Sequence, residues 1–411
     1  MSGLKEIVDK IGPGPLVAAA FIGPGTVMVC TLAGFNFGYE LLWAVALSIL
    51  ITVVLQEMAG RIGIATKKDL AELIQSQKSS TIFKIIQVLL VFGAIVIGNI
   101  AYESGNLTGA RLGLEVFFTF PKWNLAGLTL ETGNFLIGLL ALLLLWFANY
   151  QLIERILIFL VIGMSLSFLY TAIAINPDWA LVLKGFIPKI SGDNSSSVVA
   201  LIGTTVVPYN LFLYASLAKN KWKTTNSLNW MRWDIGLSVL LGGLVSMAIL
   251  IVGVSNQSEN ISDASAVAQG LQPVFGNTGI YLMGFGLMAA GLTSSITAPL
   301  AAALVICGLL GKDQSTQSTP MRLSFILIMG LGLIFASFGI RPVQLITIAQ
   351  VANGILLPFI SIWLIWVSNQ KKWMHANRNP VWIQVLSVII VLLTFLLGIR
   401  ALSSVFNWTL F

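Results

Sequence analysis

Two prolines stand inside apolar segments that would otherwise form uninterrupted helices, and each lies close to a hydroxyl side chain. In "FIGPGTVMVC", Pro24 comes two residues before Thr26; in "GTTVVPYNLFLY", Pro208 comes four residues after Thr204. Proline removes a backbone donor and clashes with the preceding turn, so each break exposes main-chain polar groups. Lipid cannot satisfy such groups, which persist at membrane depth only where they line a cavity. We therefore expect the two breaks to form a polar pocket in which hydroxyl and carbonyl oxygens contact a solute.

The composition indicates that these breaks lie in a membrane rather than in water. Of the 411 residues, 57% are hydrophobic and only 9% are charged, which is too little charge to cover a water-soluble protein of this size. Apolar stretches long enough to cross a bilayer recur throughout the chain and lack the alternation of barrel strands. The expected fold class is an all-α polytopic membrane protein. About eleven spans are predicted, at 14–36, 41–64, 83–107, 133–149, 152–174, 197–217, 235–255, 278–309, 320–338, 343–367 and 381–401.

The positions of the breaks predict an internal repeat. The first and the sixth spans are broken, so five spans separate corresponding features, and an odd number of spans inverts the second repeat. We expect a single membrane transport domain over 1–411. Within it, 1–174 forms the first repeat, 195–367 the second, and 381–401 an additional helix.

Basic residues predict the orientation. With a cytoplasmic N-terminus, 17 of the 23 Lys and Arg residues fall on the inner side, and the C-terminus lies outside. This asymmetry accounts for the net charge of +7 without nucleic acid as a partner. The expected location is the cell membrane, and nothing in the sequence implies an oligomer. Cys30 and Cys307 lie in apolar spans as packing residues, and the motifs of enzymes or cofactor sites are missing, so neither an enzymatic activity nor a cofactor is expected.

Long segments of the chain resemble the NRAMP metal-ion transporters. The resemblance is carried by "GPGPLVAAAFIGPGTVMVCTLAGFNFGYELLWAVALSILITVVLQEMAGRIGIATKKDLAELI", "GTTVVPYNLFLYASL", "DASAVAQGLQPVFG", "LMAAGLTSSITAPLAA" and "QVANGILLPF". It implies a LeuT-type fold with eleven helices and two inverted five-helix repeats, moving solute by alternating access. It also implies a substrate site formed by the first and sixth spans.

This chain departs from the family at that site. Where the family has Asp-Pro-Gly-Asn, the sequence has Gly23 and Thr26 at the ends of the motif, so a ligating carboxylate is missing. Val207 replaces the family's methionine, whose sulfur favours softer transition metals. Tyr209 and Tyr214 stand where the family has histidines that serve proton movement. In the third span, the family has two acidic residues where this sequence has Glu103 and Asn106, so one acid of the pair remains.

The candidate residues follow from the breaks and from the resemblance. The candidate substrate-binding residues are Gly23, Thr26, Thr204, Val207, Tyr209, Asn210, Gln350 and Asn353. The candidate pathway residues are Glu103, Asn106 and Tyr214, and no set of metal ligands is assigned.

Three functions remain open on these residues. Oxygen donors without a carboxylate favour a hard, partly hydrated divalent cation such as Mg²⁺ or Mn²⁺, moved without obligatory proton coupling. The alternative is a small organic solute, such as an amino acid or an amine, because the missing charge disfavours a metal. A receptor or scaffold that transports nothing is the least favoured, because it would leave two costly helix breaks unexplained.

Several polar residues receive structural interpretations. Glu57 precedes Arg61 by four residues, which predicts an ion pair along one helix. Asp234 is expected to be solvated at a span end, and His375 to be an ordinary loop residue. The hydroxyls in 293–297 are expected to bond the carbonyls of their own helix.

Overall fold

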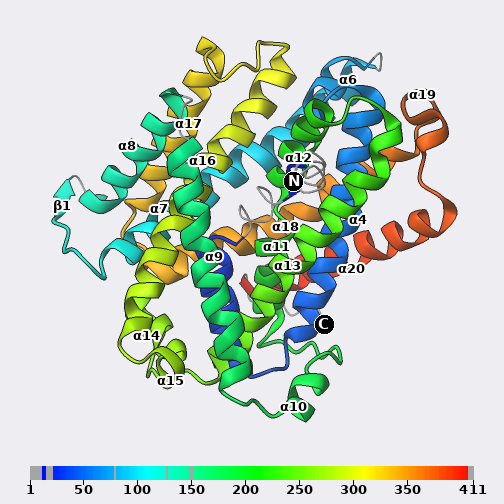
Figure 1. Cartoon of the computed structure of the whole chain (residues 1–411). Helices are drawn as coiled ribbons and strands as arrows, with labels where there is room; N and C mark the ends of the chain where they lie inside the picture. Colours follow the sequence, from blue (N-terminus) through cyan, green and yellow to red (C-terminus); the bar gives the residue numbers. More distant parts are fainter. Residues whose placement is uncertain (1–11, 15–21, 78–79, 126–127, 148–150, 406–411) are drawn as a thin grey trace, which may run out of the picture.

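The computed structural model describes residues 12–14, 22–77, 80–125, 128–147 and 151–405, and long helices make up most of this part (Figure 1). Eight helices among these residues are long and apolar enough to cross a membrane. The first half contains α3 (Pro24–Phe37), α4 (Leu42–Thr66), α5 (Leu70–Gln75), α6 (Thr81–Val91), the π-helical turn η1 (Phe92–Ile97), α7 (Gly98–Leu114), α8 (Thr132–Phe147) and α9 (Gln151–Ala174). The second half contains α11 (Ser195–Thr205), α12 (Pro208–Lys221), α13 (Leu228–Val254), α16 (Thr278–Leu310), α17 (Thr319–Ala336), α18 (Pro342–Asn369) and α20 (Val381–Val405).

The helix ends follow local chemistry. Pro24, Pro208 and Pro342 each occupy the first turn of a helix, where the missing N–H costs nothing. Asp69 begins α5 with a capping box, in which its side chain accepts from the Glu72 N–H and Glu72 accepts from the Asp69 N–H. At most ends, the helices begin and end within a few residues of the span limits that were predicted from hydropathy.

Packing between the two halves is reciprocal. Helix α13 packs on α3, and α4 packs on α12. Helix α7 lies against α16, α17 and α18, so the third span stands at the centre of the bundle. Two repeats related by a two-fold axis require such reciprocal contacts. The domain limits at 1–174, 195–367 and 381–401 remain predictions.

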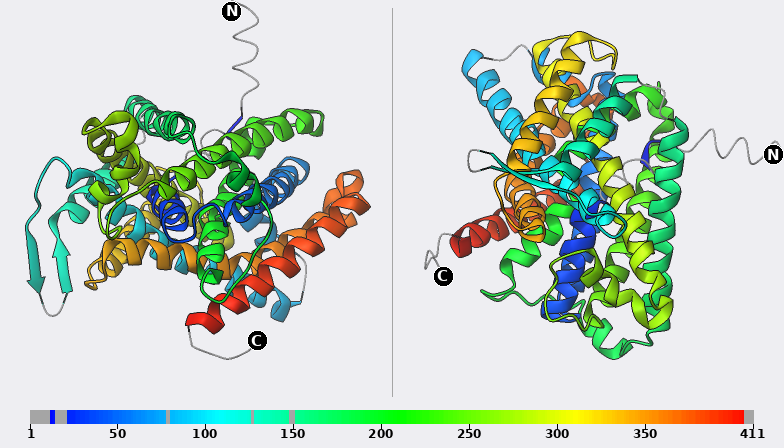
Figure 2. Two further views of the ribbon diagram at one scale, coloured as in Figure 1. Left: turned by 90° about the horizontal axis from the view of Figure 1, so that it is seen from below. Right: turned by 90° about the vertical axis from the view of Figure 1, so that its left-hand side faces the viewer.

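The connections contain elements that hydropathy did not predict. An antiparallel hairpin of β1 (Lys122–Leu125) and β2 (Leu128–Glu131) follows α7 and projects from the bundle (Figure 2). The short helices α14 (Ala264–Ala268) and α15 (Gln272–Phe275) and, apart from them, α10 (Trp179–Lys184) lie at the same end of the molecule (Figure 1). The third span also runs to Leu114 rather than 107. Its polar residues are buried among other helices, so hydropathy ended the prediction too early.

Glycines bring the helices next to the breaks into close contact. A Cβ on Gly203 would lie 2.0 Å from the backbone oxygen of Gln350, which cannot move aside. We expect Gly203→Ala to lower the free energy of unfolding by about 3 kcal/mol or more. Gly236 is the matched control, because a Cβ there meets nothing within 4 Å. Thermal unfolding in detergent should show a large loss for Gly203→Ala and little change for Gly236→Ala; equal transitions would contradict the close packing.

Candidate functional site

The two helix breaks meet side chain to side chain. The Thr26 and Thr204 hydroxyl oxygens lie 2.9 Å apart and share a hydrogen bond across 178 residues of sequence. Helix α3 begins at Pro24, and the chain is extended at Val207 between α11 and α12. The segment 15–21, on the other side of the first break, lies outside the described residues.

The second break also frees a carbonyl group. In a continuous helix, the carbonyl of Thr204 would accept a hydrogen bond from the N–H of residue 208. Pro208 has no N–H, so this bond cannot form. Thr204 therefore offers two hard oxygen atoms at one position, its hydroxyl and its carbonyl.

Three further helices close around the first break. A Cβ on Gly25 would lie 2.1 Å from Nε2 of Gln350, so the amide of α18 rests directly on this glycine. A Cβ on Gly23 would lie 2.9 Å from Oγ of Ser294 in α16 and 3.7 Å from the hydroxyl of Tyr102 in α7. The structure thus places residues 23 to 26 among α7, α11, α16 and α18.

The site is closed in this conformation. Thr26, Thr204 and Asn210 expose 0% of their surface, and Gln350 and Asn353 expose 2%. Gly23, Val207 and Tyr209 are also buried. The sequence predicted an open polar pocket between the breaks; the polar groups are there, but the two hydroxyls bond to each other across the position of that pocket.

Many polar atoms around the breaks lack hydrogen-bond partners. Among the described residues, unpaired buried atoms near the site occur on Tyr102, Glu103, Asn106, Tyr209, Asn210, Ser295, Gln350 and Asn353. Buried polar groups in folded proteins are nearly always hydrogen-bonded, and exceptions call for an explanation such as water or a ligand. Their concentration makes the surroundings of the two breaks a candidate place for water or a ligand.

Glu103 extends this cluster away from the breaks. Its side chain is fully buried, both carboxylate oxygens lack hydrogen-bond partners, and Ser295 and Asn106 are its nearest polar neighbours. The Tyr102 and Tyr209 rings meet edge to face at 5.3 Å, and Tyr102 lies near both this carboxyl group and Gln350. An ionised carboxylate in such surroundings needs a proton or a cation to compensate its charge. Glu103 and Asn106 thus adjoin the substrate-binding candidates.

Tyr214 lies elsewhere, at the end of the bundle that carries the basic loops. Its hydroxyl donates to Oδ2 of Asp234 at 3.3 Å. Asp234 also accepts from the N–H groups of Gly12 and Gly14, at 2.9 and 2.7 Å. The expectation of a solvated Asp234 is therefore wrong, because Gly12 and Gly14 lie against α13 and donate to its carboxylate.

Two ion-pair clusters strengthen the same end. The Lys219 ammonium contacts Asp69 at 3.1 Å and Glu72 at 2.5 Å, which ties α12 to α5. Burial raises the pKa of Asp69, and the Glu72 N–H and Lys219 offset only part of this shift. Burial acts on Glu72 too, but Lys219 and the Asp69 N–H outweigh it and lower its pKa. The predicted Glu57–Arg61 pair is confirmed at 3.0 Å.

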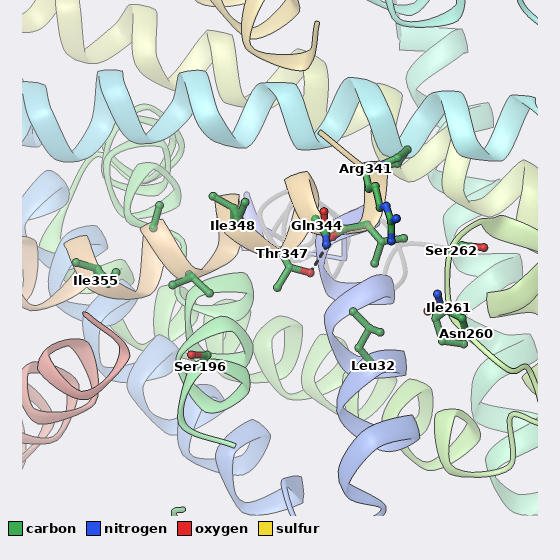
Figure 3. Close-up of a pocket in the computed structure, with 14 residues that line it drawn as sticks. Leu32, Ser196, Asn260, Ile261, Ser262, Arg341, Gln344, Thr347, Ile348 and Ile355 are labelled. Carbon is green, nitrogen blue, oxygen red and sulfur yellow. Dashed lines mark hydrogen bonds between the residues drawn. The ribbon is translucent and has the colours of Figure 1, made fainter. Parts of the chain in front are cut away.

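The opposite end contains a large hollow of about 1050 Å³ (Figure 3). Leu32 of α3, Ser196 of α11 and the loop at 260–262 line it, and Gln344, Thr347 and Ile348 project from the facing side of α18 (Figure 3). Gln350 and Asn353 belong to a different face of α18, which packs on the breaks. The hollow and the closed site thus contact different faces of α18.

The sequence did not predict Tyr102 or the serines of α16 as part of the site. Thr293 and Thr297 do bond carbonyls of their own helix, as expected. Ser294, however, faces Gly23, and Ser295 has an unpaired hydroxyl near Glu103. The polar run "TSS" in an apolar span was the only available signal, and it could not distinguish these two orientations.

The donor set is one of neutral oxygens. Among the described residues, no group of three or more His, Cys, Asp and Glu side chains gathers to hold a metal ion. Cys30 and Cys307 are free and buried. The oxygens that converge at the breaks belong to Thr26 and Thr204, with the Gln350 amide beside them.

Comparison with known proteins agrees with this architecture. The divalent metal cation transporter MntH of Nostoc sp. is 27% identical over 99% of this chain and 93% of its own length. The metal transporter Nramp5 of Oryza sativa subsp. japonica is 28% identical over 98% of this chain and 76% of its own. A crystal structure of the Eremococcus coleocola manganese transporter superposes with a TM-score of 0.76 at 24% identity, covering 98% of this chain and 88% of that one.

These likenesses fix the fold and the family. The superposition covers nearly the whole chain, so the protein has the LeuT-type fold of that transporter. The family described as natural resistance-associated macrophage protein-like matches residues 14–404. The chain therefore belongs to the Nramp family of metal-ion transporters.

Proposed function

We propose that this protein transports a divalent metal cation as a hard, partly hydrated ion, by alternating access and without obligatory proton coupling. The observation that carries the proposal is the direct contact of the Thr26 and Thr204 hydroxyls at the two breaks. When this contact opens, it presents two hydroxyls and the freed Thr204 carbonyl to one point. Such neutral oxygens suit Mg²⁺ or Mn²⁺ that keeps part of its water shell.

The relatives supply the class of substrate. The matched proteins are described as divalent metal cation, metal and manganese transporters. With Gly23 and Val207 at the breaks, this chain offers neither a carboxylate nor a thioether there. We therefore expect millimolar rather than micromolar affinity, and weak preference among divalent ions.

The proposal omits proton coupling because the site has few titratable groups. Gly23 cannot titrate, and Tyr209 is neutral near pH 7. The single histidine, His375, is exposed in the loop before α20. Among the described residues around the breaks, Glu103 contributes a carboxyl group, and it lies near Tyr102 and Tyr209.

Alternating access requires two closures to open in turn. Thr26 and Thr204 must part to admit the ion, and Asp234 must release Gly12 and Gly14 to open the basic end. We place the basic end in the cytoplasm of a cell, which puts the N-terminus inside and the C-terminus outside. The hollow beside Leu32 then faces the exterior.

Uptake into proteoliposomes tests this function. Purified protein should admit Mg²⁺ and Mn²⁺ at millimolar concentration, while a pH reporter inside the vesicles stays flat. Empty vesicles and the Thr394→Val variant are controls, because the Thr394 hydroxyl bonds a carbonyl of α20 away from the breaks. Acidification that follows metal entry would contradict uncoupled transport.

A small organic solute is the second candidate, favoured by the absence of a carboxylate from the Thr26–Thr204 contact. It would be supported if vesicles admit no divalent ion while an amino acid or an amine raises the melting temperature of the protein. In that case the metal proposal fails and the transporter assignment stands.

Glu103→Gln tests the pathway. The neutral amide cannot compensate a passing cation, so we expect metal flux to fall about tenfold, which corresponds to one lost charged interaction. Glu115→Gln is the control, because Glu115 pairs with Arg111 beyond the cluster. Unchanged flux in Glu103→Gln would make this carboxyl group a structural residue.

A further inference from the structure

A second hollow, of about 860 Å³, lies at the basic end, between the inner half of α4, the start of α13 and the start of α20. Its wall has two chemically distinct parts. One part is polar and contains Glu57, Arg61, Asn226, Asn229, Arg232, Asn377 and Arg378. The other is apolar and contains Leu50, Val53, Val54, Ile235, Trp382, Ile383 and Leu386.

The polar part carries an excess of positive charge. Glu57 is shared by two guanidinium groups, since Nε of Arg61 and Nε of Arg232 each lie 3.0 Å from its Oε1 atom. Arg61 is additionally fixed by the Asn377 carbonyl and by Asn379. With Arg378, the wall holds three cations and one anion. A ligand that completes this charge balance is negative.

Two of these arginines keep donors available at the mouth of the hollow. Arg232 is half-exposed, and its remaining contact, with Asn229, is long at 3.5 Å. Arg378 is exposed, and its Nε atom donates to the His375 carbonyl at 3.3 Å. Guanidinium groups arranged in this way match the oxygen atoms of a phosphate group.

The apolar part of the wall indicates that the ligand also has an apolar portion. Leu50 and Trp382 expose 45% and 67% of their surface, on helices that span the membrane, so this part of the wall faces the region of lipid tails. A soluble anion would gain nothing from such a wall. Basic residues at the inner surface and tryptophans at membrane borders are the usual contacts of lipid head groups.

We infer that this hollow binds an anionic phospholipid, with its phosphate between Arg232 and Arg378 and an acyl chain along Leu50, Val53 and Leu386. The bound lipid connects α20, which lies outside the two repeats, with α4 and α13. The inference rests on these contacts and is independent of the ion that the protein transports.

Lipid binding by the full-length protein in a neutral detergent tests the inference, with native mass spectrometry and thermal unfolding as readouts. Phosphatidylglycerol should remain bound and raise the melting temperature, whereas phosphatidylcholine should do neither. Arg232→Gln combined with Arg378→Gln should weaken phosphatidylglycerol binding about 10- to 30-fold, which corresponds to two cations at the membrane surface. Glu57 keeps its partner Arg61 in this variant, so folding is preserved.

Two further variants distinguish a specific lipid-binding site from nonspecific attraction of anionic lipid to the basic surface. Lys371→Gln with Lys372→Gln removes the same amount of charge from the short helix α19 (Lys371–Met374), which does not line the hollow, and should leave binding unchanged. Val53→Trp fills the apolar part without altering charge, and should weaken lipid binding. Equal weakening by the lysine variant, no effect of Val53→Trp, or equal stabilisation by inorganic phosphate would each overturn the lipid site.

Discussion

Replacing Gly23 by Asp should raise the apparent affinity for Mn²⁺ by about 10- to 100-fold, which corresponds to one charged ligand. Position 23 belongs to the first break, three residues before Thr26, and a side chain there would extend toward the hydroxyls of Ser294 and Tyr102. Adding Val207→Met should further favour Mn²⁺ over Mg²⁺, because a thioether is a softer ligand. Metal-dependent uptake in proteoliposomes measures both effects.

Because Ser294 lies close to Gly23, the Gly23→Asp variant is best combined with Ser294→Ala. A Cβ at this position lies 2.9 Å from the Ser294 hydroxyl, so that side chain must turn aside. Combining Gly23→Asp with Ser294→Ala removes the crowding and protects the experiment against misfolding. Gly163→Asp, on a glycine whose Cβ would meet nothing within 4 Å, controls for an added charge in a membrane helix. A folded Gly23→Asp/Ser294→Ala protein with unchanged Mn²⁺ affinity would mean that position 23 does not face the ion.

Removing the hydroxyl groups of Thr26 and Thr204 should cause the largest loss of metal transport. Thr26→Val with Thr204→Val keeps the shape of each side chain but leaves only the Thr204 carbonyl at the contact. We expect metal uptake at fixed concentration to fall tenfold or more, since each lost oxygen ligand costs about 1 kcal/mol. Thr394→Val should transport normally, because the Thr394 hydroxyl donates to the Ile390 carbonyl of its own helix, α20.

A double-mutant cycle separates ligand loss from structural damage. If the hydroxyls bond each other as in this conformation, their coupling in thermal stability without metal should be about 0.5 to 1.5 kcal/mol. Transport loss with no such coupling would mean that the two residues act separately. Normal transport by the double variant would remove the hydroxyls from the proposed site.

The closed contact also explains how a site of uncharged groups stays stable in the membrane. Thr26 and Thr204 satisfy each other while no ion is bound, so each hydroxyl avoids the cost of an unpaired polar group. Opening exchanges this single bond for contacts with an ion and its water. A carboxylate at position 23 would instead be a buried charge whenever the site is empty.

The membrane class, the approximate spans and the two breaks could be predicted from the amino-acid sequence. These features are local: apolar length predicts a span, and proline interrupts a helix whatever surrounds it. The Glu57–Arg61 pair was predictable for the same reason, since helical geometry alone brings residues four apart together. The resemblance on the motifs around Pro24 and Pro208 then predicted the family, which the comparisons confirm.

The contacts between side chains of different helices could not be predicted in this way. Thr26 and Thr204 are 178 residues apart, and no spacing rule predicts that their hydroxyls touch rather than enclose a cavity. Asp234 was expected in water because it follows a basic loop, yet it accepts hydrogen bonds from Gly12 and Gly14. Such contacts depend on how whole helices are placed by packing, because each side chain's partner comes from another helix rather than from its own.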